Sequence, residues 1–210
     1  MSIPGLDSLL YRRPVLKHCG DSLSDAFRLC VTCFANRGRL MVCGNGGSAS
    51  DAEHVVAELM KGFLRKRPIP EQIRKKLIGE YGDHGLYLSE HLQGVLPALS
   101  LTGSPGLSTA FSNDVAADMI FAQQVYGHGA AGDVLLAIST SGRSRNVVNA
   151  LQIARIEEIS SIGLTGGDGG EMPSLCTVTI VVPERETPRI QELHLPIYHW
   201  LCEALEATFF

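Results

Sequence analysis

His54 and Glu58 form a pair of side chains whose types and spacing could carry out chemistry. They lie four residues apart on a helix expected over residues 51–63, so both side chains share one face of that helix. An imidazole beside a carboxylate suits either metal ligation or acid–base catalysis. Pairs with this spacing are also common on ordinary helix surfaces, so the pair alone does not establish a site.

A second group of candidate side chains lies on a helix expected over residues 190–207. Gln191 and His199 are eight residues apart on it, which is roughly 12 Å along a straight helix. Pro196 lies between them and is expected to loosen or kink the helix. Two arrangements remain open: the helix bends so that both side chains reach one site, or His199 acts in the site of another subunit.

Two polar turns each follow an apolar run and open a helix. The glycine turn, Gly-Asn-Gly-Gly-Ser, covers residues 44–48, and the serine turn, Ser-Thr-Ser-Gly-Arg-Ser, covers residues 139–144. Such a turn holds an anion, because backbone N–H groups point outward there and the helix dipole favours negative charge. The serine turn has more hydroxyl groups and is the better phosphate site. Together the turns predict a ligand with a phosphate and several hydroxyls.

Continuous apolar runs predict the fold that positions these groups. Runs of this kind, rather than alternating ones, are typical of a parallel sheet covered by helices on both faces. We therefore predict one doubly wound α/β domain, with ligands at the carboxyl ends of the strands. The expected strands cover residues 40–43, 98–102, 134–138, 161–165 and 177–182, and the expected helices between them cover 50–63, 113–125 and 146–157.

Two further segments bear on the site. Asn113 and Asp114 are expected as cap residues at the start of a helix, near the same rim as the two turns. Residues 65–96 interrupt the alternation of strands and helices. They are interpreted as an insertion over or beside the site, with a surface elaboration of no catalytic role as the alternative.

The composition excludes some classes of protein. The chain has 210 residues, 45% hydrophobic content and a formal net charge of −4, so no bulk attraction to nucleic acid is expected. No apolar run approaches the roughly 20 residues that span a bilayer, and no signal peptide is recognised. The six cysteines lack the spacing of a zinc site and are expected to be reduced thiols, so a cytoplasmic location is expected.

These motifs together resemble the sugar isomerase (SIS) domain family and, more narrowly, the phosphoheptose isomerases within it. The resemblance covers nearly the whole chain from about residue 20, except 65–96. The residues that carry it are 43–48, 51–54, Glu58, Asn113, Asp114, 132–142, Ser144, 164–166, 168–170, 189–192 and His199. The resemblance implies an aldose–ketose isomerase that converts sedoheptulose 7-phosphate to D-glycero-D-manno-heptose 7-phosphate.

The same resemblance implies roles for individual residues. The sugar would be contacted by Asn45, Gly46 and Gly47, and bordered by Asn113 and Asp114. The phosphate would be held by Ser139, Thr140, Ser141 and Ser144. Zinc, bound in some members, would be held by His54, Glu58, Gln191 and His199, and the substrate would also touch Glu58 and Gln191. The family is a homotetramer with shared sites, in which the N-terminal helix would serve oligomer packing and His199 would act in a second chain.

Three features depart from the family pattern. The insertion at 65–96 is absent from compact members and resembles a longer subgroup. Pro188 lies where the pattern commonly has an aspartate, and Pro196 is unexpected inside the last helix.

A ketose–aldose conversion needs one base at carbon and one acid–base group at oxygen. We expect Glu58 at carbon and His199 at oxygen, with the reverse assignment open. The alternatives are a non-catalytic binding protein of the replication-initiator-associated type and an isomerase or sensor for another phosphosugar. Such binding proteins lack the equivalents of Glu58 and His199, which favours an enzyme here.

Overall fold

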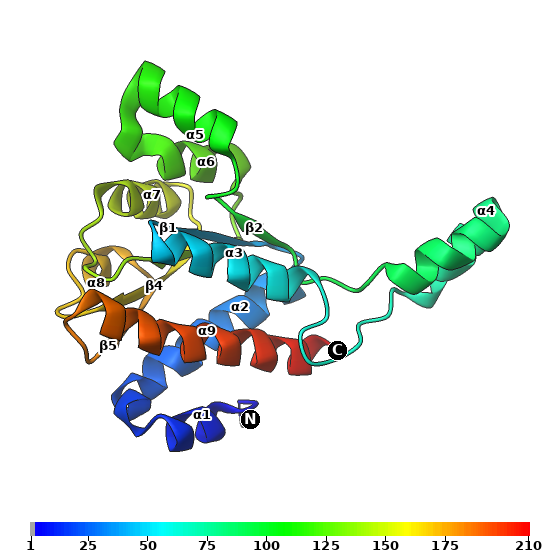
Figure 1. Cartoon of the computed structure of the whole chain (residues 1–210), viewed down its shortest axis with the longest axis horizontal. Coiled ribbons are helices and arrows are strands. Elements are labelled where there is room, and N and C mark those ends of the chain that lie inside the picture. Colours follow the sequence, from blue (N-terminus) through cyan, green and yellow to red (C-terminus); the bar gives the residue numbers. More distant parts are fainter. Residues whose placement is uncertain (1–2) are drawn as a thin grey trace.

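A sheet of five parallel strands lies at the centre of the structure, a computed structural model that describes residues 3–210 (Figure 1). The strands lie in the order β2-β1-β3-β4-β5, and each neighbouring pair is parallel. Their bounds are β1 Leu40–Gly44, β2 Ala98–Ser100, β3 Val134–Ile138, β4 Ser160–Gly166 and β5 Val178–Val182. The five predicted strands and the doubly wound parallel sheet are thereby confirmed.

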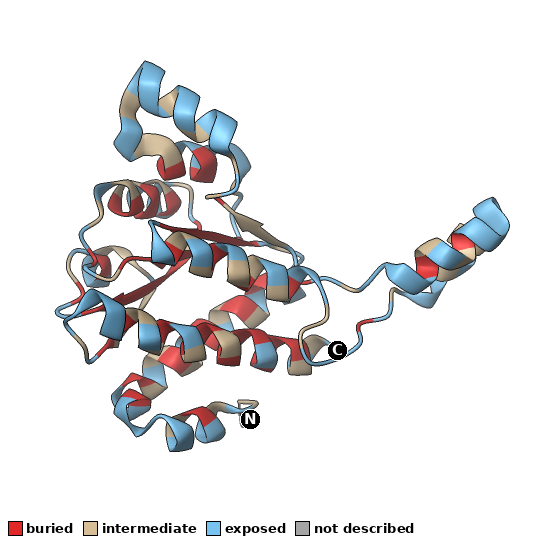
Figure 2. Cartoon of the chain, viewed as in Figure 1, coloured by how far each residue is buried: buried red, intermediate tan, exposed pale blue. Residues whose placement is uncertain are grey.

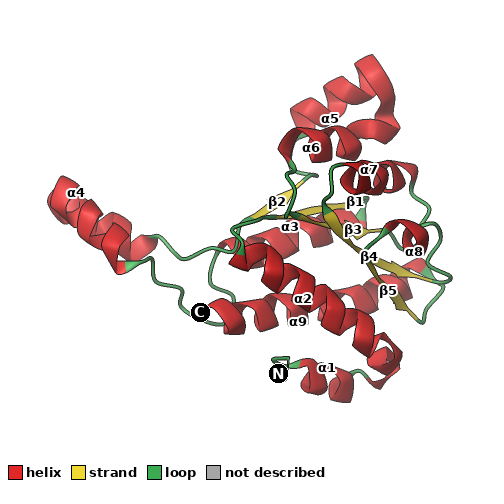
Figure 3. Ribbon diagram, turned by 180° about the vertical axis from the view of Figure 1, so that it is seen from behind, coloured by secondary structure: helices red, strands yellow, loops and turns green. Residues whose placement is uncertain are grey.

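Helices cover both faces of this sheet (Figure 3). Within β1, Leu40 and Val42 face one core, and Met41 and Cys43 face the other. Buried on both faces, the strand has no polar position, which explains the continuous apolar runs of the sequence. One core lies under α1 Leu6–Arg12, α2 Gly20–Ala35, α3 Gly47–Met60 and α9 Thr187–Phe209, and the other under α6 Ile120–His128, α7 Arg145–Ile156 and α8 Met172–Leu175.

The first core also holds the N-terminal segment against the last helix. Leu9 of α1 is buried in this core, and Trp200 of α9 donates its indole N–H to the carbonyl of Pro4 at 3.0 Å. A short 3-10 helix, Pro14–Cys19, then leads into α2. Figure 2 shows how the buried residues of α2 and α9 line the side of each helix that meets the sheet.

The predicted insertion is a helical arm that projects from the body (Figure 1). Its helix α4, Glu71–His91, is folded back on itself at Gly82, where φ is 54° and ψ is −129°. The two chain segments at its root are joined by a hydrogen bond from the amide of Gly62 to the side-chain carbonyl of Gln93 at 2.6 Å. Tyr81 and Tyr87 on the arm are more than half exposed, at 57% and 55%.

One predicted helix start is wrong. Asn113 and Asp114 are not cap residues, because a helix already begins at Pro105 and runs as α5, Pro105–Phe111. A π-helical turn, Ser112–Ala116, and a 3-10 turn, Ala117–Met119, continue it into α6. Proline is favoured in the first turn of a helix, where its missing N–H has no partner to lose, and this signal at Pro105 locates the true start.

Other helix ends differ by a few residues. The helix after the glycine turn begins at Gly47 and ends at Met60, earlier at both ends than expected. The last helix begins at Thr187, with Pro188 in its first turn. Pro196 does not break α9, which runs without interruption to Phe209. Within residues 3–210 we find no helix with both the length and the apolar character to cross a membrane.

Candidate functional site

Both polar turns lie at the point where the strand order reverses. From β1 the chain goes outward to β2, whereas from β3 it goes the other way to β4 and β5. Gly44 pairs in register with Ile138, so the residues that follow β1 and β3 leave the sheet side by side. The crevice at such a switch point is the usual ligand site of open α/β sheets.

A pair of amides joins the two turns. Asn45 donates to the side-chain carbonyl of Asn146 at 2.8 Å, and Asn146 donates back to Asn45 at 2.9 Å. Asn146 is in the first turn of α7, directly after the serine turn. Asn146 is not among the predicted site residues, because nothing in its local spacing indicates that its partner is Asn45, 101 residues away.

The serine turn is shaped by its own hydroxyls. Ser139 is buried and lies 3.1 Å, hydroxyl to hydroxyl, from Ser144, the residue that precedes the first turn of α7. The hydroxyl of Ser141 accepts the amide of Arg143 at 3.2 Å. Hydroxyls and the N–H groups of a helix start are thus gathered in one place, as an anion site requires.

A second loop is locked onto the serine turn. Gly142 has φ of 64°, and a Cβ there would collide with the backbone of Gly169 and Gly170. The amide of Glu171 donates to the carbonyl of Gly142 at 3.0 Å. Arg143 makes two hydrogen bonds to Asp168, at 2.8 and 2.6 Å, which hold the pKa of that carboxyl well below its usual range.

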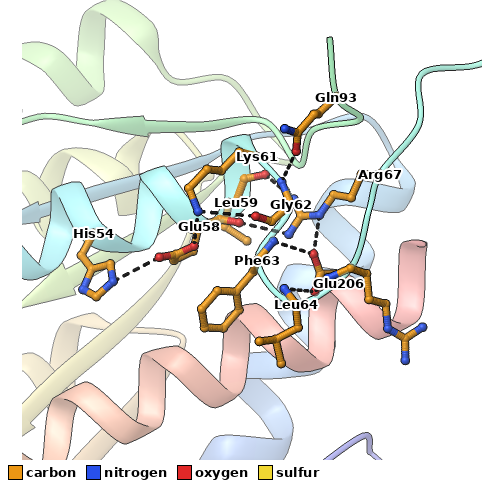
Figure 4. A network of polar contacts seen from close by, with 11 residues as sticks. His54, Glu58, Leu59, Lys61, Gly62, Phe63, Leu64, Arg67, Gln93 and Glu206 are labelled. Carbon is orange, nitrogen blue, oxygen red and sulfur yellow. Dashed lines mark hydrogen bonds and ion pairs between the residues drawn. The ribbon is translucent and has the colours of Figure 1, made fainter. Parts of the chain in front are cut away.

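His54, Glu58 and His199 come together on α3 and α9 of one chain. The Nε2 of His54 lies 3.2 Å from Glu58 Oε1, and the ring centroids of His54 and His199 are 4.9 Å apart. Lys61 contacts the other carboxylate oxygen of Glu58 at 2.7 Å (Figure 4). The ring of Phe63 lies 5.7 Å from that of His199. The cluster therefore contains both groups expected to transfer protons.

Within one chain His199 already lies beside His54, so a straight α9 brings these two rings together, and a site shared with a second chain stays a prediction. Helix α9 runs along α3 in the same direction, so its later residues meet the later residues of α3. Gln191 lies at the other end, where a Cβ on Gly47 would come within 2.5 Å of its Nε2. The outlying residue of the four is thus Gln191, beside the glycine turn, and not His199.

Asp51 and Tyr198 support the cluster, and neither is among the predicted site residues. The Tyr198 hydroxyl donates to Asp51 at 3.0 Å and lies 3.3 Å from Nδ1 of His54. A His54 that donates its Nδ1–H to this hydroxyl keeps Nε2 directed at Glu58, which is how a metal-binding histidine is usually oriented. Burial raises the pKa of Asp51, against the effect of the Tyr198 hydrogen bond.

The environment of His199 favours the neutral form of its imidazole. Burial and the neighbouring His54 lower its pKa below the ordinary value. Its Nε2 is buried and has no hydrogen-bond partner among the described residues. A nitrogen left in this state can accept a proton or bind a metal.

The side chains of the cluster are of types that can bind a zinc ion. Imidazole and carboxylate are ligands that zinc prefers, and the unpartnered Nε2 of His199 belongs to a ring that lies 4.9 Å from the ring of His54, centroid to centroid. Over residues 3–210 no group of three His, Cys, Asp or Glu side chains is close enough together to hold a metal ion. The donor set fits zinc in chemical type, with His54, Glu58 and His199 as its core.

Asn113 and Asp114 lie apart from this cluster. Both are exposed on the π-helical turn, where Asn113 donates to Asp114 at 2.8 Å. Within the described chain neither makes a polar contact with the glycine or serine turn. The structure therefore does not bring them together with the other predicted site residues.

His194, on the inner face of α9, predicts a pH dependence of stability. It is fully buried, both ring nitrogens lack a partner in the described chain, and burial lowers its pKa from 6.5 to about 4. Between pH 6.5 and about pH 4, His194 takes up a proton in the unfolded chain but not in the folded one. The free energy of unfolding should therefore fall by about 3 kcal/mol as pH decreases from about 6.5 to 4.

Urea unfolding across this pH range tests the prediction. His194→Leu should remove this part of the dependence and leave the part due to carboxylates, which both proteins share. Parallel curves for the two proteins would contradict it.

Comparisons with known proteins show which family the chain resembles in sequence and fold. A model of the SIS domain matches residues 11–77 and 84–166. Phosphoheptose isomerase of a Nitratiruptor species is 39% identical over 181 residues, which are 86% of this chain and 83% of that protein. The Rhodospirillum rubrum phosphoheptose isomerase is 39% identical over 91% of this chain and 88% of its own length. The structure of phosphoheptose isomerase GmhA from Neisseria gonorrhoeae superposes with a TM-score of 0.75 at 32% identity, covering 96% of this chain and 94% of that one.

Proposed function

Since the chain belongs to the SIS domain family and, within it, to the phosphoheptose isomerases, we propose that Glu58 and His199 carry the proton transfers of its reaction. The chain is an aldose–ketose isomerase that interconverts sedoheptulose 7-phosphate and D-glycero-D-manno-heptose 7-phosphate. The observation that carries the assignment is that Glu58 and His199 both lie against His54, one on α3 and the other on α9.

The serine turn is the proposed binding site of the substrate phosphate. The hydroxyls of Ser139, Thr140, Ser141 and Ser144 and the start of α7 would hold it, and Asn45, Gly46 and Gly47 would lie against the sugar. Helix α3 begins at the glycine turn and carries Glu58 on its last full turn. Gly47 and Glu58 are eleven residues apart, roughly 16 Å along α3, which is longer than a heptose phosphate. The serine turn of one chain would therefore hold the phosphate while Glu58 and His199 of a neighbouring chain act at the other end of the substrate, as in a tetramer with shared sites.

The proton steps use two groups. Glu58, whose side chain is only 12% exposed, removes a proton from C1 of the ketose and returns it to C2. His199, a neutral imidazole, donates a proton to the oxygen at C2 and accepts one from the oxygen at C1. Both groups end in the protonation state in which they began, as the cis-enediol route requires.

We also propose a zinc ion held by His54, Glu58 and His199. When bound, zinc polarises the carbonyl and stabilises the charge of the enediolate. Gln191 as a further ligand stays a prediction, because its side chain lies beside Gly47.

An assay with sedoheptulose 7-phosphate tests the function and the metal together. Product should form in a discontinuous assay, and pretreatment with a chelator should lower the rate at least tenfold, with recovery on adding zinc. An unchanged rate after chelation, with no metal found by elemental analysis, would exclude zinc and leave the isomerase intact. A response to hexosamine phosphates alone would contradict the heptose assignment.

A homo-oligomer with a contact through the arm is the remaining part of the proposal. The exposed Ile73, Tyr81 and Tyr87 on α4 leave apolar surface for a second copy of the chain. Deleting residues 68–92 should convert the expected tetramer to smaller species, such as dimers that still contain complete shared sites, with the activity of those sites retained. Light scattering and the isomerase assay measure the two effects. Loss of activity from an intact tetramer would instead indicate a lid.

A cytoplasmic location is proposed from the cysteines. All six are free thiols, and burial raises the pKa of Cys43 to about 12 and that of Cys176 to about 11. Unpaired thiols in this number suit a reducing compartment.

A further inference from the structure

A buried ion pair lies beside the cluster, and the mechanism above does not use it. Arg67 Nε lies 2.8 Å from Glu206 Oε1, and the two side chains are 0% and 1% exposed (Figure 4). Buried pairs of this kind are costly to assemble, because both charges leave water. Its contacts on either side connect it to the groups proposed to transfer protons.

Glu206 holds the loop that follows α3. Its carboxylate accepts the amides of Phe63 and Leu64, both at 2.8 Å, and that of Arg65 at 3.1 Å. Burial alone would raise the pKa of Glu206, but these amides and Arg67 lower it overall, so the group is a carboxylate. The loop residue Phe63 in turn packs against the ring of His199.

Arg67 holds the end of α3 itself. Its Nη1 donates to the carbonyl of Leu59 at 2.7 Å, and its Nη2 donates to the carbonyl of Glu58 at 3.0 Å. The last four carbonyls of a helix lack partners within it, and a cation is favoured at that end. Arg67 therefore caps the turn of α3 that carries the Glu58 side chain.

We propose that Arg67 and Glu206 are positioning residues for the isomerase reaction. Arg67 fixes Glu58 through its own backbone carbonyl, and Glu206 fixes His199 through Phe63. The inference rests on the proposed roles of Glu58 and His199. Since the phosphate site lies at the opposite end of α3, loss of the pair should lower kcat and change KM little.

Glu206→Gln and Arg67→Lys test the pair, with Asp133→Asn as the matched control. Glutamine keeps the shape of Glu206 without its charge. Lysine keeps the charge of Arg67 but loses the planar fork whose three nitrogens each reach a different acceptor, the carboxylate and two carbonyls. Asp133 is also a buried carboxylate that accepts two backbone amides, from Arg39 and Ala130, away from the cluster.

The expected result separates positioning from stability. At a temperature where melting curves show every variant folded, Glu206→Gln and Arg67→Lys should lower kcat at least tenfold with KM within threefold. Asp133→Asn should lower the melting temperature and keep kcat within twofold. If Glu206→Gln does not fold, the test uses Arg67→Lys and a further variant, Phe63→Leu. Phe63→Leu leaves the Arg67–Glu206 ion pair intact and removes the ring that packs against His199.

Two outcomes would overturn the inference by different routes. Full kcat in the folded pair variants, or an equal loss in Asp133→Asn, would overturn it while the roles of Glu58 and His199 stand. Full turnover in Glu58→Gln would overturn those roles, and the inference with them.

Discussion

Glu58→Gln is expected to abolish isomerisation while sedoheptulose 7-phosphate still binds. Glutamine has the size of glutamate but cannot take a proton from carbon. General acid–base catalysis contributes about 10²- to 10⁴-fold, so kcat should fall by at least that factor. The dissociation constant should change less than about threefold, because the phosphate is held at the serine turn by residues that the substitution does not touch.

The rate is best measured together with isotope exchange. In D₂O a base at carbon exchanges its proton with solvent, so the wild type should incorporate deuterium into substrate and product. Glu58→Gln should lose this exchange. His199→Asn should lose net conversion and keep some exchange at carbon. Exchange that survives in Glu58→Gln and disappears in His199→Asn would establish the reverse assignment.

Glu53→Gln provides a matched control on the same helix. Glu53 is exposed on α3, where it accepts the hydroxyl of Thr102 at 3.1 Å. Glu53→Gln changes the net charge of the protein by the same amount as Glu58→Gln, yet its kcat should stay within twofold of the wild-type value. Undiminished turnover in Glu58→Gln, with this control unchanged, would exclude Glu58 as the base.

The sheet and the two turns could be predicted because their signals are local. Each strand is buried on both faces, so its run of apolar residues is visible without knowledge of its neighbours. The serine turn likewise shows its hydroxyls and helix start within six residues. The helix start before Asn113 also has a local signal, the proline at Pro105, which outweighs the capping tendency of Asn113 and Asp114.

The meeting of His199 with His54 could not be predicted, because tertiary contacts decide it. The direction and register of α9 along α3 follow from the contact of Gln191 with Gly47 at one end and of Glu206 with the loop at the other. Neither contact leaves a pattern in the sequence. Asp51, Tyr198 and Asn146 were missed for the same reason, since each acts through a partner distant in the chain.

Gly142→Ala is expected to damage phosphate binding more than any single change of a hydroxyl in the serine turn. A non-glycine residue at φ of 64° costs about 1–2 kcal/mol, and the added Cβ would also press against the backbone of Gly169 and Gly170. The serine turn and the loop after β4 must then separate. KM should rise at least tenfold, and the free energy of unfolding should fall by about 2–4 kcal/mol.

Gly127→Ala supplies the comparison that isolates this effect. Gly127 lies in α6 with nothing within 4 Å of an added Cβ, so alanine there should leave KM unchanged and stabilise the helix by up to about 1 kcal/mol. Urea unfolding and initial rates measure both variants, and inorganic phosphate serves as a direct probe. It should raise the melting temperature of the wild type and of Gly127→Ala, and fail to raise that of Gly142→Ala. Equal protection of all three proteins would mean that the phosphate binds elsewhere than at the serine turn.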